Sequence, residues 1–282
     1  MTQPPVYYSQ EQAPVCPRHP ERVAYVRCQR CDRPVCPGCQ VPSPVGVRCV
    51  DCARAAVSSR RPARTVLGGA PASGAKVTIG FIGLCVLVYL LQQVPELGVT
   101  RLLAFNPALA DTEPWRFLTT ALLHGSLPHL AFNMFALWVA GAQLEGVLGR
   151  WRYLALLLLS AFGGSTMIYL LASPGSGSWT TWTVGASGAV FGLFATLLVV
   201  QRRFGRDTSA VLGLLAVNLL ISFVGANVSW QGHLGGLLAG AALASVYAWA
   251  PRGRRTQVSV AGTVVLALAL LALAVLRSLL VA

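Results

Sequence analysis

Charge is what this sequence has least of: 11% of its 282 residues are charged, whereas 55% are hydrophobic. A soluble domain carries roughly a quarter charged residues, so a soluble globular protein is a poor description of most of the chain. The mean hydropathy of +0.61 places most of the sequence in lipid rather than in water. The apolar segment of a secretory signal peptide is missing from residues 1–20, which are polar and rich in proline.

Acidic residues are the scarcer charged kind, with 9 Asp and Glu against 22 Lys and Arg and a formal net charge of +13. Residues 1–76 hold 11 of the basic residues and 4 of the acidic ones. This excess of arginine favours a cytoplasmic head and cytoplasmic loops, following the positive-inside bias of membrane proteins. Because the basic residues form no continuous stripe beside aromatic residues, no nucleic-acid partner is expected.

Long stretches without charge indicate membrane-spanning helices, since a bilayer core is crossed by about 20 apolar residues. The stretches are Val77–Pro95, Phe117–Leu144, Tyr153–Gln201, Thr208–Pro251 and Thr256–Leu276. They predict seven helices, near residues 78–94, 128–147, 152–172, 187–201, 208–224, 231–249 and 257–280. With seven helices, one side of the membrane receives the basic residues before the first helix and those that follow the second, fourth and sixth helices, namely Arg150, Arg152, Arg202, Arg203, Arg206, Arg252, Arg254 and Arg255. We therefore expect a cytoplasmic N-terminus and a C-terminus outside.

Seven of the eight cysteines lie in a short N-terminal cluster, and the eighth, Cys85, stands alone in an apolar run. The cluster consists of four pairs of Cys or His residues, and the members of each pair are three positions apart: Cys16 and His19, Cys28 and Cys31, Cys36 and Cys39, and Cys49 and Cys52. Eight ligands suit two tetrahedral zinc ions, and this spacing favours metal binding in a reducing compartment over disulfides. Spacing leaves open whether the ions take the pairs sequentially or in an interleaved way. The pattern resembles a B-box-type zinc finger, and less closely a zinc ribbon.

Two polar residues in the apolar region indicate chemistry. Ser187 opens the fourth helix and His233 lies in the sixth, and the expected topology places both near the outer face at similar depth. A serine beside glycine commonly serves helix packing, and a buried histidine can simply bond a carbonyl, but ionisable residues in membranes tend to be functional. GxxxG pairs, Gly188 with Gly192 and Gly236 with Gly240, would let the two helices approach closely. A base within reach of the hydroxyl is what a nucleophilic serine needs.

Further polar residues would complete such a site. His129 and Asn133 share one face of the second helix and could stabilise an oxyanion together with the Ser187 N–H; interhelical hydrogen bonding is the alternative reading. Phe191, one turn after Ser187, could hold the imidazole plane. His124 is expected to be a structural hydrogen-bonding residue.

An acid to complete a triad is missing. Of the few acidic residues in the apolar region, Glu145 lies at the cytoplasmic end of the second helix, three turns from Asn133. We expect it to cap or bridge near Gly141 and Gly149 rather than to take part in catalysis. The sequence therefore predicts a Ser–His dyad.

These motifs, in this order, resemble the rhomboid protease family over about residues 77–250. The residues that carry the resemblance are Trp115, Arg116 and Phe117, then His124, His129, Asn133 and Glu145, then Gly185, Ala186, Ser187 and Gly188, and last His233, Gly236 and Gly240. The resemblance implies Ser187 as nucleophile, His233 as general base and His129 with Asn133 as oxyanion-hole side chains. It also implies that Trp115 and Arg116 form a membrane-embedded first-loop motif, and that Glu145 is structural. Phe191 stands where the family often has tyrosine.

The expected fold is an all-α polytopic membrane protein: a rhomboid-like six-helix core with a seventh, C-terminal transmembrane helix and a small N-terminal zinc-binding domain. The parts are a disordered leader (1–14), a zinc-binding module (15–53), a flexible basic linker (54–76), the protease core (77–250), and a cytoplasmic loop with the seventh helix (251–282). By the resemblance, the partners are transmembrane protein substrates, cleaved near their outer ends, within a lipid bilayer. We expect a bacterial plasma membrane, no catalytic cofactor, and a cytoplasmic protein partner for the zinc module.

Three alternatives to an active protease differ in kind. An inactive rhomboid-like protein that binds membrane helices would keep the scaffold but lose the serine or the histidine, and both are present. A small transporter or receptor would explain seven helices but not the ordered polar residues, and we see no inverted repeat of the kind that transporters carry. A zinc-finger adaptor that the membrane merely anchors would need one helix rather than seven.

Overall fold

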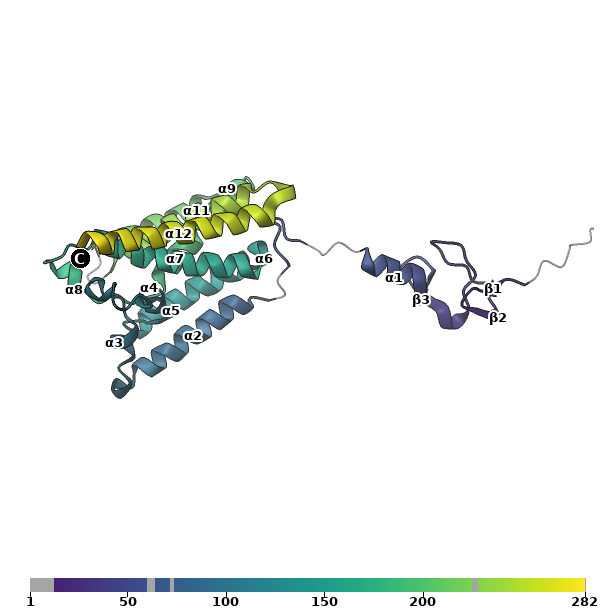
Figure 1. Cartoon of the computed structure of the whole chain (residues 1–282), viewed down its shortest axis with the longest axis horizontal. Coiled ribbons are helices and arrows are strands. Elements are labelled where there is room, and N and C mark those ends of the chain that lie inside the picture. The colour runs from purple at the N-terminus through teal and green to yellow at the C-terminus, as the bar shows by residue number, and fades with distance from the viewer. Residues whose placement is uncertain (1–12, 60–63, 72–73, 225–227, 282) are drawn as a thin grey trace, which may run out of the picture. The chain divides into compact units, whose positions relative to one another are not determined.

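The computed structural model describes residues 13–59, 64–71, 74–224 and 228–281. The chain forms two compact units, residues 1–62 and 63–282, which are considered separately (Figure 1). The expected leader, residues 1–14, lies almost wholly outside the described residues.

The first unit is a small fold built around cysteines. Its elements are β1 (Val15–Cys16), β2 (His19–Val23), η1 (Pro37–Cys39), β3 (Gln40–Pro42), β4 (Val47–Cys49) and α1 (Val50–Ser58). β1 pairs antiparallel with β2, and β3 pairs antiparallel with β4. Beside five cysteines, its buried core contains only Ala24 and Val35. So small an apolar core contributes little to offset the chain entropy lost on folding.

The second unit is a bundle of helices. Its long helices are α2 (Lys76–Gln92), α7 (Arg150–Leu171), α9 (Ser187–Arg203), α10 (Ser209–Val224), α11 (Trp230–Trp249), α12 (Arg255–Val281) and the continuous run of α5 (Leu127–Ala136), η5 (Leu137–Gly141, a π-helix) and α6 (Ala142–Leu148). Short elements connect them, namely η2 (Pro95–Leu97), α3 (Val99–Leu103), η3 (Pro107–Leu109), α4 (Arg116–Thr119), η4 (Thr120–Leu122), α8 (Gly177–Thr180) and η6 (Arg252–Arg254). In the described part of the chain, the seven long helices lie where the sequence predicts them.

The helices differ in how well each alone would cross a bilayer. Leu127–Leu148, Arg150–Leu171 and Arg252–Val281 are long and apolar enough, and the bent pair Lys76–Gln92 with Pro95–Leu103 would make a fourth. α9 and α10 are shorter, with 17 and 16 residues. The fold is thus that of an integral membrane protein in which some helices rely on their neighbours for their place in the bilayer.

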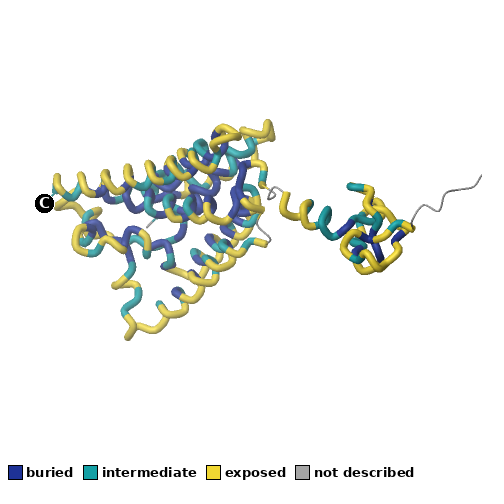
Figure 2. The backbone as a smooth tube through the Cα atoms, turned by 45° about the vertical axis from the view of Figure 1, so that its right-hand side comes forward, coloured by how far each residue is buried: buried dark blue, intermediate teal, exposed yellow. Residues whose placement is uncertain are grey.

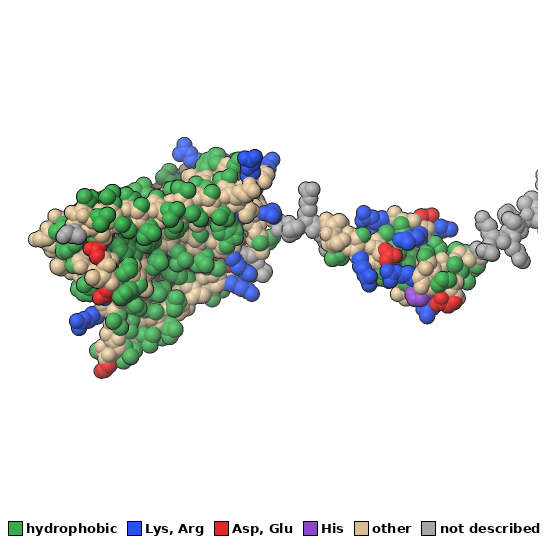
Figure 3. All heavy atoms as spheres, in the orientation of Figure 1, with side chains coloured by type: hydrophobic (Ala, Val, Ile, Leu, Met, Phe, Trp, Pro, Cys, Tyr) green, Lys and Arg blue, Asp and Glu red, His purple; other side chains and the backbone are tan. Residues whose placement is uncertain are grey.

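The surface of the helical unit is inverted relative to a soluble protein. Large exposed side chains along the helices are apolar, for example Leu87, Phe132, Val217 and Leu268. Figure 3 shows an apolar band on the visible face of this unit, with charged side chains gathered toward its two ends. Such a band matches the hydrocarbon core of a bilayer.

The interior is formed by α7, α9 and α11, which pack more closely against one another than any other helices. A Cβ added at Gly236 would run into the carbonyl of Gly188, and one at Gly240 would run into the backbone of Gly192. The two GxxxG pairs therefore do let α9 and α11 approach backbone to backbone. Burial is concentrated inside this part of the unit, whereas α2 and α12 are mostly exposed (Figure 2).

Residues 54–76, the expected linker, include described parts with secondary structure and tertiary contacts. α1 continues to Ser58, beyond the expected end of the module at residue 53. Residues 65–69 form a turn that is closed by backbone bonds between Thr65 and both Gly68 and Gly69. Leu67 in this turn is buried in the core of the helical unit, and a Cβ at Gly69 would collide with the carbonyl of Leu148. The buried Leu67 side chain therefore anchors this turn to the helical unit.

Candidate functional site

The loop before Ser187 positions this residue, and backbone bonds to the segments around Phe105 and Thr120 hold that loop in place. The residues before it are tied to the region after α3 by the antiparallel bridge of Phe105 with Thr183, whose two backbone bonds measure 3.0 and 2.8 Å. The Gly185 N–H donates to the carbonyl of Thr120 at 3.1 Å. Ser187 is the first residue of α9. Its N–H is therefore among those that have no partner within the helix.

His233 lies on α11 against the same end of α9. Its ring stacks on Phe191 with centroids 4.2 Å apart and planes inclined by 13°. Phe191 follows Ser187 by four residues on α9, so the two side chains share a helix face. The structure therefore brings the imidazole to the face of α9 that carries Ser187. Both His233 and Phe191 are buried, at 8% and 3% exposure.

The second nitrogen of His233 meets a residue that the sequence reasoning missed. Ser222 Oγ, on α10, lies 2.5 Å from His233 Nδ1. Ser222 also donates to the carbonyl of Asn218, one turn earlier, at 2.7 Å. Nothing in the sequence distinguishes Ser222 from a packing serine, because its partner lies on another helix.

His129 and Asn133 lie on α5, and the His129 ring lies against Gly185 in the loop before Ser187. Asn133 Nδ2 donates to the carbonyl of His129 at 2.9 Å, and the N–H of Gly125 donates to His129 Nδ1 at 3.4 Å. Since Nδ1 accepts, the ring proton is assigned to Nε2. A Cβ at Gly185 would lie 3.0 Å from His129 Nε2 and 3.6 Å from Ser187 Oγ. The Nε2–H donor and the serine hydroxyl thus both border Gly185.

Trp115 and Arg116, the expected first-loop motif, bond neighbouring parts of the chain. Arg116 is buried and forms an ion pair with Glu113, donates to the carbonyl of Ala104 at 2.7 Å, and lies 5.3 Å from the ring centre of Trp182. Trp115 is half exposed and donates to the carbonyl of Leu102 at 3.2 Å. Both residues hold the segment that ends in Phe105, which in turn pairs with Thr183.

Glu145 and His124 are both buried but differ in the hydrogen bonds that their side chains make. The fully buried Glu145 carboxylate accepts from the N–H groups of Val77 and Thr78, and from the Thr78 hydroxyl at 2.9 Å. It therefore caps the N-terminus of α2, whose first turn has free N–H groups to offer. Glu145 Oε1 also lies 3.9 Å from Nε of Arg150, the residue after Gly149. The expectation of side-chain bonding fails for His124: its ring nitrogens have no hydrogen-bond partner among the described residues.

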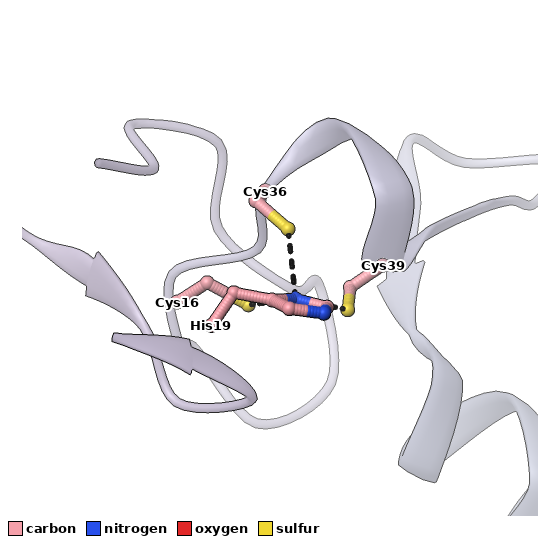
Figure 4. A group of neighbouring side chains, drawn as sticks. All are labelled: Cys16, His19, Cys36 and Cys39. Carbon is pink, nitrogen blue, oxygen red and sulfur yellow. Dashed lines mark hydrogen bonds between the residues drawn. The ribbon is translucent and has the colours of Figure 1, made fainter. Parts of the chain in front are cut away.

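The Cys and His ligands of the first unit form two compact groups. One comprises Cys16, His19, Cys36 and Cys39, and the other Cys28, Cys31, Cys49 and Cys52. The ligand pairs are thus interleaved, which the sequence left open. In Figure 4, His19 points between the three sulfurs, with Nδ1 at 3.3 Å from both Cys36 Sγ and Cys39 Sγ. In the other group, Cys31 Sγ and Cys49 Sγ are 3.8 Å apart.

These distances fit a tetrahedral metal. Sulfurs bound to one zinc at about 2.3 Å each are separated by about 3.8 Å in a regular tetrahedron. The Cys16 thiol is prepared for ligation because a backbone hydrogen bond from Cys36 is the main cause that lowers its pKa to about 6. Around the second group, Arg33 Nε lies 3.4 Å from Cys31 Sγ, which offsets thiolate charge. Asp51 is held by Arg18 at 2.5 Å, and this bond lowers the pKa of the Asp51 carboxyl.

Comparisons with known proteins all find similarity to rhomboid proteins. A Rhomboid domain model matches residues 111–250. "Putative rhomboid protease YdcA" of Bacillus subtilis is 33% identical over 141 residues, which cover 48% of this chain and 68% of that protein. "Rhomboid protease GluP" of the same organism is 33% identical over 171 residues, 57% of this chain and 32% of that protein. "Rhomboid protease AarA" of Providencia stuartii is 29% identical over 165 residues, 50% of this chain and 58% of that protein. The chain thus spans about a third of the length of GluP.

Proposed function

The chain belongs to the rhomboid family, and we propose that it is an intramembrane serine endopeptidase that works through a dyad of Ser187 and His233. The observation that carries this proposal is the stacking of His233 on Phe191, one turn after Ser187 on α9. An imidazole stacked one helical turn from a serine supports the pairing that activates a hydroxyl. The relatives reported above, which are named as rhomboid proteases, support the same chemistry.

The reaction would follow the acyl-enzyme route. Ser187 Oγ attacks the scissile carbonyl while His233 takes the hydroxyl proton, and His233 then gives that proton to the leaving amine. Water, activated by the same imidazole, hydrolyses the ester. Of the carboxylates that the structure describes, Glu145 caps α2 and Asp111 bonds Tyr169 at 2.8 Å. A dyad is therefore the arrangement that these residues support.

Three donors are available to the oxyanion. They are the N–H of Ser187 at the start of α9, Nε2–H of His129, and the Asn133 N–H that remains beside the one given to His129. Removing one such donor from a protease costs roughly 10²- to 10³-fold in kcat. The helix dipole of α9 adds partial positive charge at the same end.

Substrates would be transmembrane helices, unwound near the outer face so that a peptide bond can reach Ser187. The orientation follows from arginine: Arg150, Arg202, Arg203 and Arg254 lie at helix ends that the positive-inside bias assigns to the cytoplasm. The N-terminus is then cytoplasmic and the C-terminus outside, in a bacterial plasma membrane. The zinc module would lie in the cytoplasm, where a protein partner could bind it.

Zinc is the metal that best fits seven thiolates and one imidazole in two tetrahedral groups. Cys16, His19, Cys36 and Cys39 would hold one ion, and Cys28, Cys31, Cys49 and Cys52 the other. Both ions would be structural, because every ligand position is filled by the chain and the groups lie in a unit apart from Ser187.

The test is cleavage of a model transmembrane substrate by the purified full chain in detergent, compared with Ser187→Ala and His233→Ala. We expect cleavage by the wild type and a loss of at least about 10³-fold in both variants. Wild-type protein that is folded but cleaves none of several substrates would favour the helix-binding, inactive alternative. Cleavage that persists in Ser187→Ala would refute the assignment of the nucleophile.

A further inference from the structure

The hydroxyl of Ser222 is the polar group on α10 that reaches into the site. Ser222 is 2% exposed, and its Oγ lies 2.5 Å from His233 Nδ1. The rest of α10 is largely apolar and turned outward, as Leu212, Val217 and Leu220 are. At the same end of α10, the ring of Phe223 stacks on Trp230 of α11 with centroids 5.2 Å apart. The bond to His233 is therefore made at a point where α10 is held against α11.

The direction of this hydrogen bond follows from a count of protons. A serine hydroxyl has one proton to donate and two lone pairs. The proton of Ser222 is directed at the carbonyl of Asn218, at 2.7 Å, and a carbonyl can only accept. Ser222 Oγ must then accept from His233, so Nδ1 carries the hydrogen. In the neutral ring this leaves the lone pair on Nε2, the nitrogen that a base turned toward Ser187 has to use.

Stacking on Phe191 cannot make this choice. A 180° turn of the imidazole about its bond to Cβ keeps the ring in the same plane, 13° from that of Phe191, and exchanges nitrogen for carbon positions. Only a directional partner distinguishes the two orientations. In the serine protease triad a carboxylate performs this task, and here the carboxylates Glu145 and Asp111 are engaged elsewhere.

We propose that Ser222 is a positioning residue that fixes the tautomer and ring orientation of His233, so that α10 supplies a third member to the Ser187–His233 pair. This inference rests on the proposed protease function for its kinetic consequence, though not for its structural one. Ser222 touches neither substrate nor the reacting atoms and acts through His233.

The kinetic test compares Ser222→Ala with Ser222→Thr, which keeps the hydroxyl, and with a matched control, Ser245→Ala. Ser245 on α11 makes the same bond to a carbonyl one turn back, Ala241, at 2.8 Å. We expect Ser222→Ala to lower kcat about 10- to 100-fold with little change in KM, a part of what a general base contributes. Ser222→Thr should restore most of this loss. Equal turnover in Ser222→Ala and Ser245→Ala would overturn the proposal.

A second measurement separates this inference from the protease function. Nitrogen NMR of protein labelled with ¹⁵N at histidine reports which ring nitrogen carries hydrogen, and His233→Ala identifies the signal. At a pH where the ring is neutral, we expect the Nδ1–H form in the wild type and a shift toward Nε2–H in Ser222→Ala only. A wild type that cleaves nothing yet shows this shift would refute the protease but keep the positioning role. An Nε2–H form in the wild type would overturn the positioning role, whether or not the protein cleaves substrates.

Discussion

At the scale of single residues, Gly185 is the position where a methyl group should do most damage. Its φ of +138° suits glycine, and an added Cβ would lie 2.9 Å from the His129 ring. Gly185→Ala should therefore displace a proposed oxyanion donor and lower kcat/KM by roughly 10²- to 10³-fold. Gly177→Ala is the control, since a Cβ there meets nothing within 4 Å. Similar cleavage rates in the two variants would contradict the placement of His129.

Glu145 is predicted to affect stability and not chemistry. Its carboxylate accepts three hydrogen bonds at the start of α2, and it is fully buried. Glu145→Gln replaces one carboxylate oxygen by an NH₂ group, which would face a backbone N–H of α2 that needs an acceptor. We therefore expect a loss of about 1–3 kcal/mol of unfolding free energy. Thermal unfolding in detergent measures this. A lower rate of cleavage per folded molecule, with an unchanged melting temperature, would argue for a catalytic role instead.

His233 and Ser222 show which single residues of the candidate site can be predicted from the sequence. His233 stood out because a histidine is rare in an apolar stretch, and its stacking partner shares a helix face with Ser187. Ser222 did not stand out, because serine is common in membrane helices and its partner follows eleven residues later on another helix. Glu145 was read as a cap, but its target is far away in sequence, at Thr78.

At the scale of elements, α12 is tied to the bundle at both ends. Near its start, Ser259 accepts from the buried Arg152 at 3.0 Å, and Thr263 bonds Tyr247 at 2.7 Å. Near its end, Arg277 donates to the carbonyl of Ala172 at 2.6 Å. These bonds explain how a mostly exposed helix keeps its position beside α7 and α11.

Of the two bonds near the start of α12, one involves a charged arginine and the other joins two neutral hydroxyls, so we predict that their loss destabilises the protein unequally. The Arg152 guanidinium is 1% exposed, and its two Nη atoms have no hydrogen-bond partner among the described residues. Ser259→Ala removes the partner of Nε as well, so it should cost about 1.5–3 kcal/mol. Thr263→Val breaks a neutral pair, worth about 0.6 kcal/mol in a membrane protein. Thermal unfolding of both variants checks the order, and a larger loss in Thr263→Val would contradict it.

The positions of the helices were predictable because lipid imposes a simple rule, the absence of charge over about 20 residues. The docked turn around Leu67 was not predictable, because two adjacent apolar residues, Val66 and Leu67, give no periodic signal. The division of the zinc ligands was also beyond the sequence: the spacing within Cys16–His19 or Cys28–Cys31 is the same in a sequential and in an interleaved arrangement.

At the scale of the whole molecule, two units with different sources of stability should respond differently to metal removal. The first unit has a core of cysteines, whereas the core of the second consists of packed apolar helices. We expect two zinc ions per chain by elemental analysis. A strong chelator should unfold the first unit and leave the helical content of the second unchanged, as circular dichroism and limited proteolysis would show.

Two substitutions make this prediction specific. Cys36→Ser should lower the zinc content by one ion, because Cys36 belongs to a single ligand group. Cys85→Ser should leave zinc unchanged, since Cys85 lies on α2 and faces the carbonyl of Ala121. One ion per chain in the wild type, or a loss of zinc in Cys85→Ser, would contradict the assignment of two interleaved centres.

The central claim is that His233 makes Ser187 nucleophilic, and covalent labelling tests it most directly. The full chain in detergent would be treated with a fluorophosphonate, which reacts with activated serines, and the adduct located by mass spectrometry. The account predicts one adduct, on Ser187, that is lost in His233→Ala and unaffected in Ser245→Ala. An adduct on another serine, or equal labelling of Ser187 in His233→Ala, would contradict it.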